Sequence, residues 1–538
     1  MKKSLAIIFL SSFIACSQVD NLTTTTNPRT SGLYQNDWNN EVLSDEVRGV
    51  WITNIDSEVM FSKKATAEAI DYLADRGYNV VFPVVWNDGY TLFPSRTMEK
   101  YFGVEYKIDT LFAKQGRDPL AELIIEGHRR GLEVIPWYEF GFSSSINQAG
   151  GHILKKYPNW SAKGPDGSLL TKNGFEWMNA FDPEVQSFLT ELVMEIPQYY
   201  DVDGVQGDDR LPSLPSHGGY EPYTISLYTT ETGKDVPNDP LEPDFLKWKA
   251  DRLSAYGKSL FETVKAYDPT LIVSYSPIIY PWGYNNYLQD WPAWVKGGYV
   301  DLLIPQAYRY DINQYKETVD EIISYAIQPD AKPYTLAMGI LTKSGPRYNG
   351  PQYVKNAIRY NRIKGSSGEV YFFYEGMNHN NEHLADTLFS SFYAKPATLP
   401  YRNGEVRRKP ALILNEKEAL FTGEWSKVSS DNAFDGEYQW GTGKAEFVFK
   451  DTESARYEVY VHFPYELNLE QSPKVELGFG NHTDGEFFNK PLTGKLEGWV
   501  LAGEVIASQS DWVKVGISGT TLIPVDGVMM LKKLNKKK

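Results

Sequence analysis

The sequence predicts an α/β fold, a (β/α)8 barrel, followed by a small all-β sandwich domain. Short apolar runs recur along residues 47–376, and a segment with helical spacing follows each of them. Runs that are apolar throughout are typical of parallel strands buried on both faces, and eight strand–helix units in succession favour a closed barrel. After residue 410 the runs become short and alternating or β-branched, with Gly, Asn and Asp turns between them, which is typical of a sandwich.

Eight predicted strands alternate with eight predicted helices. Two of the helices open with Asp-Pro, at 118–119 and 182–183, because Asp caps a helix N-terminus and Pro fits the first turn. The predicted strands are residues 47–53, 78–85, 132–139, 202–209, 271–277, 300–308, 334–340 and 369–376. The predicted helices are residues 65–77, 118–131, 182–200, 244–267, 286–297, 312–328, 351–365 and 381–394.

These patterns divide the chain into a barrel over 46–395, a linker containing Pro and Arg over 396–410, and the sandwich over 411–538. Because the strand-end carboxylates all precede the linker, we expect a chain ending near residue 400 to stay folded. Long connections follow the second, third and fourth strands, on the face where barrels of this kind carry their active sites. They span 86–117, 140–181 and 210–243, and the predicted sandwich strands are 445–449, 457–463, 474–479, 499–506 and 512–517.

The N-terminus carries the one cysteine of the chain. Residues 1–16, MKKSLAIIFLSSFIAC, combine two lysines, a short apolar core and small residues before Cys16. This is a lipoprotein signal peptide pattern, in which the cysteine is lipidated; the alternative is an ordinary signal peptide with an incidental cysteine. Residues 17–45 are polar and rich in Thr and predict a flexible tether. We expect a lipid-anchored protein of the bacterial cell envelope, at the outer membrane or the cell surface.

Composition limits the partners. The formal charge of −15 comes without any stripe of Lys and Arg, which excludes a nucleic-acid partner. We expect a monomer that meets the membrane through its lipid anchor only. Aromatic residues make up 14% of the chain, a level that either sugar stacking or a large core would explain.

Carboxylates stand at the C-terminal ends of the predicted strands. The fourth strand ends in Asp208 and Asp209, and the third and eighth carry Glu139 and Glu375. Strand alternation turns Asp208 to the barrel axis together with Gln206, and leaves Asp209 at the rim. By the same alternation Glu139 shares a face with Trp137, and Glu375 with Tyr371 and Phe373.

Two carboxylates of this kind suit glycosidic bond hydrolysis. One gives a proton to the leaving oxygen and the other acts as nucleophile or base, about 5–5.5 Å apart for retention and roughly 6.5–9.5 Å for inversion. Asp208 is the leading candidate, Glu375 or Glu139 its partner, and Asp209 a further member. The alternative for each acid is a salt bridge to an arginine such as Arg210.

Aromatic and polar residues gather close to the same strand ends. A glycan needs flat apolar faces for its rings and polar groups for its hydroxyls. The candidate substrate-binding residues are Trp51, Trp86, Trp137, Gln206, Arg210, Trp282, Gln306 and Tyr308.

No cofactor or metal is expected. The segment from His379 to His383 matches the H-x-x-E-H zinc pattern, but it lies in the polar connection after the eighth strand instead of on an apolar helix. Capping of the eighth helix or a substrate contact is the preferred interpretation. The sequence contains neither a Gly-rich phosphate loop nor a G-x-S-x-G elbow.

The barrel segments resemble the bacterial glycosyl-hydrolase-like family ten. The resemblance rests on RGVWIT (48–53), YNVVFPVVW (78–86), HRRGLEVIPWYE (128–139), DVDGVQGDDR (201–210), LQDWPAWVKGGYVDLLIPQAY (288–308) and GEVYFFYEG (368–376). It implies a TIM-barrel envelope lipoprotein and a glycosidase of peptidoglycan strands stripped of stem peptides. The family's aspartate pair falls on Asp208 and Asp209. The family pattern has a His and a larger apolar residue where Gln206 and Gly207 stand.

The C-terminal segment, with GEWSKVSSDNAFDGEYQW (423–440) and ARYEVYVHFPY (455–465), resembles golvesin-type β-sandwich modules, which implies binding. The first hypothesis is an envelope glycoside hydrolase. The alternatives are a non-catalytic glycan-binding lipoprotein, and a hydrolase of another polysaccharide such as an α-glucan. The linkage, the anomeric outcome and the ligand of the sandwich do not follow from the sequence.

Overall fold

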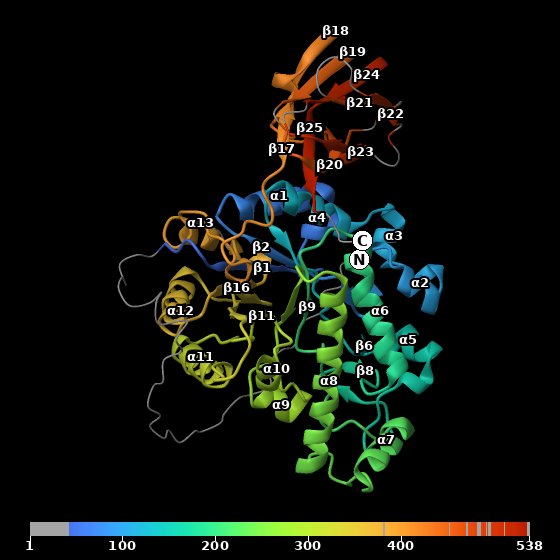
Figure 1. Ribbon diagram of the computed structural model, residues 1–538, viewed down its shortest axis with the longest axis vertical. Coiled ribbons are helices and arrows are strands. Elements are labelled where there is room, and N and C mark those ends of the chain that lie inside the picture. The colour runs from blue at the N-terminus through green and yellow to red at the C-terminus, as the bar shows by residue number, and fades with distance from the viewer. Residues whose placement is uncertain are drawn as a thin grey trace. The chain divides into compact units, whose positions relative to one another are not determined.

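A computed structural model of the protein describes residues 42–379, 382–450, 452–467, 469, 472–480, 486–490, 492, 496–509 and 512–534. The chain forms two compact units (Figure 1). The α/β unit comprises the chain up to Glu58, Asp75–Leu120 and Val134–Val406. The sandwich unit comprises Val59–Ala74, Ala121–Glu133 and the chain from Arg407 on. Cys16 lies outside the described residues.

The strands that precede the site residues form two sheets. One sheet has the order β13-β16-β1-β2-β5 and the other β12-β11-β10-β9, and the strand pairs whose register is known are parallel. Each of the eight predicted strand runs contains a strand of the structure. Their bounds are β1 Val47–Ile52, β2 Val80–Pro83, β5 Glu133–Val134, β9 Gly204–Gly207, β10 Ile272–Tyr275, β11 Leu302–Leu303, β12 Thr335–Leu336, β13 Met338–Leu341 and β16 Gly368–Phe372.

Single bridges connect the edges of these two sheets. Trp137, just after β5, pairs in parallel with Gln206 of β9, and Gln306, just after β11, pairs with Gly339 of β13. The amide of Gln206 donates to the carbonyl of Pro136 at 2.9 Å. The strand order is therefore consistent with a barrel, in a mixed α/β fold.

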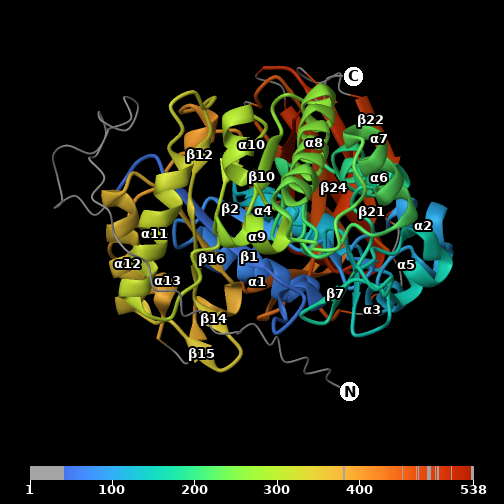
Figure 2. The ribbon, with the colours of Figure 1, turned by 90° about the horizontal axis from the view of Figure 1, so that it is seen from below.

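Helices lie on the outer side of the strands, as Figure 2 shows for α8, α11 and α12. All eight predicted helical runs overlap a helix of the structure; for example, Asp182 caps α6 by accepting from the amide of Glu184. The corresponding helices are α1 Lys63–Ala74, α4 Pro119–Arg129, α6 Pro183–Tyr199, α8 Pro243–Tyr267, α10 Trp291–Gly297, α11 Ile312–Ala326, α12 Pro351–Ile363 and α13 Leu384–Phe389. None of the helices within the described ranges is long and apolar enough to cross a membrane.

The three long connections, and those after the fifth and seventh predicted strands, contain further short elements that the sequence did not predict. The helices are α2 Arg96–Phe102, α3 Thr110–Gln115, α5 Gly151–Lys156, α7 Pro222–Thr232 and α9 Trp282–Tyr287. The strands are β3 Trp86–Asn87, β4 Tyr90–Thr91, β6 Ser143–Ile146, β7 Thr171–Lys172, β8 Phe175–Trp177, β14 Lys343–Ser344 and β15 Arg347–Tyr348.

The sandwich unit contains two antiparallel sheets, of order β17-β25-β20-β23 and β18-β19-β24-β21-β22. Inward residues such as Phe447, Val459 and Val515 form its core. The bounds are β17 Leu412–Asn415, β18 Leu420–Ser429, β19 Glu437–Phe449, β20 Ala455–Phe463, β21 Lys474–Gly480, β22 Glu486–Lys490, β23 Gly498–Ala507, β24 Trp512–Val525 and β25 Gly527–Lys533. The five predicted sandwich strands correspond to β19, β20, β21, β23 and β24.

Two helices from the first part of the chain belong to the sandwich unit. On α4, Ile125 packs against a buried cluster that includes Tyr460, Trp499 and Met529. The carbonyl of Arg129 accepts from the amide of Ala411 at 3.0 Å, and its guanidinium lies 5.5 Å from the ring of Phe434. On α1, the ammonium groups of Lys63 and Lys64 donate to the sandwich at Glu497 and Asn432. The apolar face of α4 is therefore partly covered by residues that follow Arg407, and hydrogen bonds connect α1 to the same part of the chain.

We predict that a chain ending at Val406 is less stable than the whole protein, in contrast to the sequence-based expectation. Ile125 and Arg129 would lose the partners that cover them, which should cost at least about 2 kcal/mol. Thermal melting of the truncated and the full chain measures this. In the full chain, Trp499→Ala should lower the same melting transition. An unchanged transition in both proteins would contradict the prediction.

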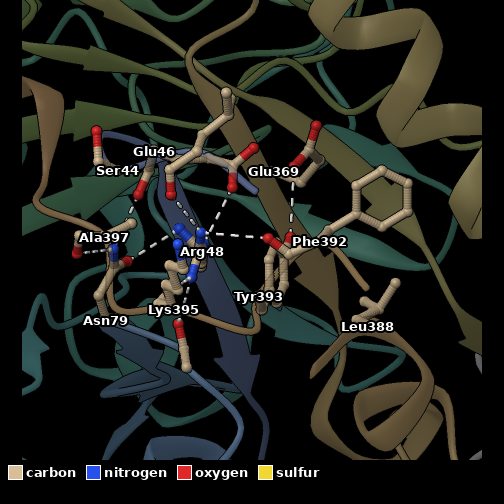
Figure 3. Close-up of polar contacts among 12 residues, drawn as sticks. Ser44, Glu46, Arg48, Asn79, Glu369, Leu388, Phe392, Tyr393, Lys395 and Ala397 are labelled. Atoms are coloured by element: carbon tan, nitrogen blue, oxygen red, sulfur yellow. Dashed lines mark hydrogen bonds and ion pairs between the residues drawn. The ribbon is translucent and has the colours of Figure 1, made fainter. Parts of the chain in front are cut away.

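A buried arginine joins the start of β1 to the last segment of the α/β unit. The Arg48 guanidinium is fully buried, pairs with Glu46 at 3.0 Å and lies 4.4 Å from the ring of Tyr393 (Figure 3). It also donates to the carbonyls of Lys395, Leu43 and Phe392. The charge of Arg48 thereby fixes main-chain segments that are more than three hundred residues apart in sequence.

Glu369 of β16 lies at the edge of this network. It accepts from the amide of Asn361 and the hydroxyl of Tyr393. Burial raises the pKa of Glu369 from an ordinary value of 4.5 to about 8, and the charge of Glu46 adds to the rise, while Arg362 opposes it. The carboxyl of Glu369 therefore keeps its proton in the folded protein at neutral pH.

We predict that this proton makes stability depend on pH. Between about pH 5 and pH 8 the unfolded chain releases the proton and the folded protein holds it, so the free energy of unfolding falls as pH rises. Glu369→Gln removes this titration, and the decline over the window should shrink by about 3 kcal/mol. Denaturant unfolding at several pH values measures it. Glu262→Gln, at an exposed pair with Lys258, serves as control and should leave the slope unchanged; equal slopes in all three proteins would disprove the assignment.

Candidate active site

Asp208 lies directly after β9, whose neighbours are β10 on one side and the segment after β5 on the other. Its carboxylate accepts from the indole nitrogen of Trp137 at 2.8 Å and from the backbone amide of Arg210 at 2.9 Å. Gln206, two residues earlier, accepts from the indole nitrogen of Trp51 at 2.7 Å and donates to Ser274 at 2.9 Å. Asp208 thus contacts Trp137 beside the neighbouring β5, while Gln206 contacts Ser274 of the neighbouring β10 and Trp51 of β1, a strand that does not pair with β9.

Arg210 gathers three carboxylates around one guanidinium. Its Nη2 lies 3.5 Å from Glu139 and 3.6 Å from Asp208, and its Nη1 lies 3.2 Å from Asp209. The paired oxygens of Glu139 and Asp208 therefore lie no more than about 7 Å apart, on either side of one shared nitrogen. The sequence left two alternatives for each acid, a salt bridge to an arginine or a place in a cluster of acids. The structure shows both at once, because the clustered acids all pair with Arg210.

Close packing holds Arg210 in place. Its guanidinium lies 4.7 Å from the ring of Phe175 and 5.6 Å from that of Phe140, and its Nε donates to the carbonyl of Glu139 at 2.6 Å. Gly141 has φ +48°, and a Cβ there would collide with the carbonyl oxygen of Arg210. Glycine at 141 is therefore required for the loop after β5 to lie against Arg210.

The three acids differ in exposure. Their side chains are 18% exposed for Glu139, 10% for Asp209 and 2% for Asp208. Glu139 also accepts from the amide of Asn87 at 2.5 Å. Glu139 is thus the member of the group that solvent and ligands reach most easily.

Burial and mutual repulsion change the proton affinities of these groups. Burial raises the pKa of Asp208 well above its ordinary value, and Asp209 adds to the rise while Arg210 opposes it. Burial also raises the pKa of Glu139, against the opposing effects of Arg210 and Asn87. Burial disfavours the cation of Arg210, but the three carboxylates outweigh it and raise its pKa. Arg210 therefore stays charged, and the buried acids hold protons more tightly than acids in water.

Aromatic rings lie beside the acids. The ring of Phe372, at the end of β16, is 6.2 Å from Trp51, 6.3 Å from Trp137 and 5.3 Å from Tyr308. Burial raises the pKa of the Tyr308 hydroxyl well above its ordinary value, and the charges of Asp209, Asp208 and Glu139 add to the rise. Tyr308, Trp51 and Trp137 thus belong to the same cluster as the acids.

The expectation that Tyr371 lies on the site-facing side of the eighth strand is wrong. Tyr371 bonds with the hydroxyl of Tyr393 at 2.5 Å and packs edge-on against Tyr78, while Phe372 takes the position among the site aromatics. Glu375 falls in a short 3-10 helix, Tyr374–Gly376, where it accepts from the amide of Glu58 at 3.4 Å. No interaction of Glu375 with the Arg210 group is found among the described residues.

The remaining predicted residues lie in different surroundings. Trp86 is fully buried, donates to the carbonyl of Gly141 at 3.1 Å and packs against Phe188 of α6. Gln306 donates to the carbonyl of Ser276 at 3.0 Å. Trp282 opens α9, half-buried, 5.6 Å from the ring of Tyr287.

Four residues of the site were missed. Asn87 follows Trp86 directly, just after the end of a predicted strand. A side-chain amide at such a position can orient a carboxylate, so the sequence could have predicted its contact with Glu139. Gln289 donates to the carbonyl of Asp208 at 2.8 Å, and it comes from the stretch 288–308 that carries the family resemblance. Phe372 and Phe175 carry no polar signal, because only packing places them.

A metal site is not found in the part of the chain that the structure describes, where no three His, Cys, Asp or Glu side chains are grouped to hold an ion. His383 lies 3.3 Å from Asp386, and His379 packs 5.0 Å from the ring of Tyr348. His383 occupies the N-cap position of α13 without a capping side-chain hydrogen bond.

Comparison with known proteins places the chain in a family. The profile described as glycosyl hydrolase-like 10 matches residues 46–353, more than half of the chain. The chain is 24% identical over 418 residues to glycosyl hydrolase YngK of Bacillus subtilis. The matched region covers 68% of this chain and 76% of YngK. It is 24% identical over 309 residues to glycosyl hydrolase DigH of Escherichia coli K12, covering 49% of this chain and 64% of DigH.

Among solved structures, the PgaB (BpsB) glycoside hydrolase domain from Bordetella bronchiseptica aligns with a TM-score of 0.47 and 15% identity, over 64% of this chain and 98% of that domain. The family match spans the strand ends that carry Glu139, Asp208 and Tyr308. The chain belongs to the glycosyl hydrolase-like 10 family, and both the predicted family and the predicted enzyme class, a glycoside hydrolase, are confirmed.

Proposed function

We propose that this protein cleaves glycosidic bonds in a bacterial envelope glycan with Asp208 and Glu139 as its carboxylate pair. The observation that carries this proposal is the single guanidinium of Arg210, whose Nη2 contacts both acids. One cation cannot neutralise two nearby carboxylates, so one acid of the pair keeps a proton while the other carries charge. Glycoside hydrolysis needs this combination of a proton donor and a charged partner.

The remaining groups fit supporting roles. The indole of Trp137 and the amide of Asn87 orient the two acids through hydrogen bonds. Asp209 raises the pKa of both acids, and Tyr308 offers a hydroxyl that burial and the three acids keep protonated. The strand order supports a closed (β/α)8 barrel, in which residues from separate strand ends meet at one face.

The substrate we propose is the glycan of peptidoglycan strands that lack stem peptides. The sequence resemblance supports this substrate. The family profile and the two named relatives support glycoside hydrolysis without naming a glycan. Hydrolysis of another polysaccharide, such as an α-glucan, would use the same acids on a different sugar.

We predict that Asp208→Asn and Glu139→Gln each lower turnover of peptide-free peptidoglycan strands by at least ~10²–10⁴-fold, because each removes a group that transfers a proton or attacks the sugar. New reducing ends, measured by mass spectrometry, report the rate. Glu375→Gln, which changes an acid outside the Arg210 group, is the matched control and should retain most activity.

Melting temperatures separate chemistry from folding in these variants. Loss of activity with unchanged melting supports the proposed pair. Wild-type rates for Asp208→Asn would exclude it from the mechanism, and loss in Glu375→Gln alone would identify a different pair. A wild-type protein that binds but never cleaves any glycan in a polysaccharide panel would favour the non-catalytic alternative.

We also propose that Cys16 anchors the protein to the membrane by lipidation, as the run Phe13-Ile14-Ala15-Cys16 indicates. Cys16→Ser should move the protein from the membrane to the soluble fraction, because a protein held by several acyl chains stays bound and one without them does not. Cell fractionation and mass spectrometry of the mature N-terminus measure this. A membrane fraction unchanged by the substitution, or a mature N-terminus elsewhere, would rule out the anchor.

A further inference from the structure

Lys172 is a half-buried cation at the end of β7, in the long connection after β5. Its ammonium donates to the carbonyl and the side-chain oxygen of Asn286 at 3.0 and 3.2 Å. No carboxylate lies within ion-pair distance of Lys172 among the described residues. Burial alone lowers the pKa of Lys172 to about 8, so it is mostly charged at neutral pH. A partly desolvated cation without a counter-ion is costly, and a bound anion would relieve that cost.

Aromatic rings and polar groups surround this lysine. The ammonium lies 4.4 Å from the ring centre of Tyr287 and 6.0 Å from that of the half-buried Trp282. The amide of the exposed Asn173 donates to the hydroxyl of Tyr287 at 3.0 Å. A flat indole beside a cation and an amide has the composition of a sugar subsite, since rings stack and polar groups bind hydroxyls.

The cluster adjoins the acids. Lys172 pairs across its hairpin with Phe175, whose ring lies under the Arg210 guanidinium. The segment that carries Trp282 and Tyr287 also carries Gln289, which bonds the carbonyl of Asp208. The charges of Asp209 and Arg210 act on the hydroxyl of Tyr287. A sugar held at Lys172 would therefore belong to a glycan whose neighbouring unit reaches the acid group.

Lys249 shows what a structural lysine looks like in the same region. It is fully buried, and its ammonium donates to three backbone carbonyls, those of Ser216, Gly218 and Pro240. Among the described residues Lys172 donates hydrogen bonds to Asn286 only, and it lies beside the buried ring of Tyr287 and the half-buried ring of Trp282. Its position is that of a group left available for a ligand.

We propose that Lys172, with Trp282, Tyr287 and Asn173, forms a subsite that recognises a carboxylate-bearing sugar unit of the substrate. This inference deepens the proposed function and rests on it. Uronic acids and muramic acid with a free lactyl ether are two sugars that carry such a group, and they serve as the probes below. The subsite selects for the negative charge that a stem peptide would otherwise mask.

Binding of monosaccharides to the full chain tests this without any cleavage. The probes are glucuronic acid and N-acetylmuramic acid, each compared with its neutral counterpart, glucose or N-acetylglucosamine, by calorimetry at pH 7. We predict that wild-type protein binds at least one acid about tenfold or more tightly than its neutral counterpart, the order expected for one charge-assisted hydrogen bond. Lys172→Met should abolish that preference and Lys172→Arg should retain it. Lys163→Met, a half-buried lysine in the same connection, is the matched control.

The pH dependence gives a second readout. The groups facing Lys172 are His217, Tyr287 and, beyond Tyr287, Asp209 and Arg210. Because the ammonium loses its charge near pH 8, the preference for the acid should weaken above that pH in wild type and persist in Lys172→Arg.

Equal affinities for acid and neutral sugar in wild type, or an undiminished preference in Lys172→Met, would overturn the subsite. A preference for N-acetylmuramic acid only, or for glucuronic acid only, supports it and identifies the source of the carboxylate. A protein that shows the preference yet cleaves no glycan would refute the proposed hydrolysis and leave this subsite standing.

Discussion

The candidate site depends on one buried cation that serves three anions. Arg210 is 5% exposed, and its guanidinium is fixed by two aromatic rings and by the carbonyl of Glu139. Without this charge, three carboxylates would face one another in a poorly solvated space, where the repulsion between them is far stronger than in water. Three features of the structure keep that guanidinium in place. They are the positions of the acids, the close approach of the chain at Gly141 and the ring of Phe175.

Gln206 and Gly207 fit the same arrangement. The amide of Gln206 bridges Trp51 and Ser274, which fixes the indole of Trp51 beneath the acids. A side chain at Gly207 would collide with the carbonyl of Leu211, so glycine allows the chain to turn back directly after Asp208 and Asp209. A larger residue there would require the segment that carries Arg210 to move. This pair of residues therefore bears on how the arginine is presented, as well as on the substrate.

The sequence predicted those parts of the fold and site that depend on periodicity. Buried strands and amphipathic helices were found because their patterns repeat, and alternation along β9 placed Asp208 and Gln206 correctly. The same alternation failed for β16, because its phase was counted back from Glu375, which lies in a 3-10 helix after the strand has ended, so Phe372 takes the place expected for Tyr371. Phe175 and Gln289 were missed because packing between distant segments, and not local pattern, brings Phe175 to Arg210 and Gln289 to Asp208. The short helices α2, α3 and α5 carry too few turns for a periodic signal.

The grouping of α1 and α4 with the C-terminal strands has a consequence for biosynthesis. The two helices leave the ribosome long before the residues that cover Ile125 and Arg129, and at about 5–20 residues per second the delay is on the order of tens of seconds. During that interval part of their surface is without its native cover. A deferred final packing step leaves these helix surfaces accessible to chaperones until the C-terminal strands have been synthesised.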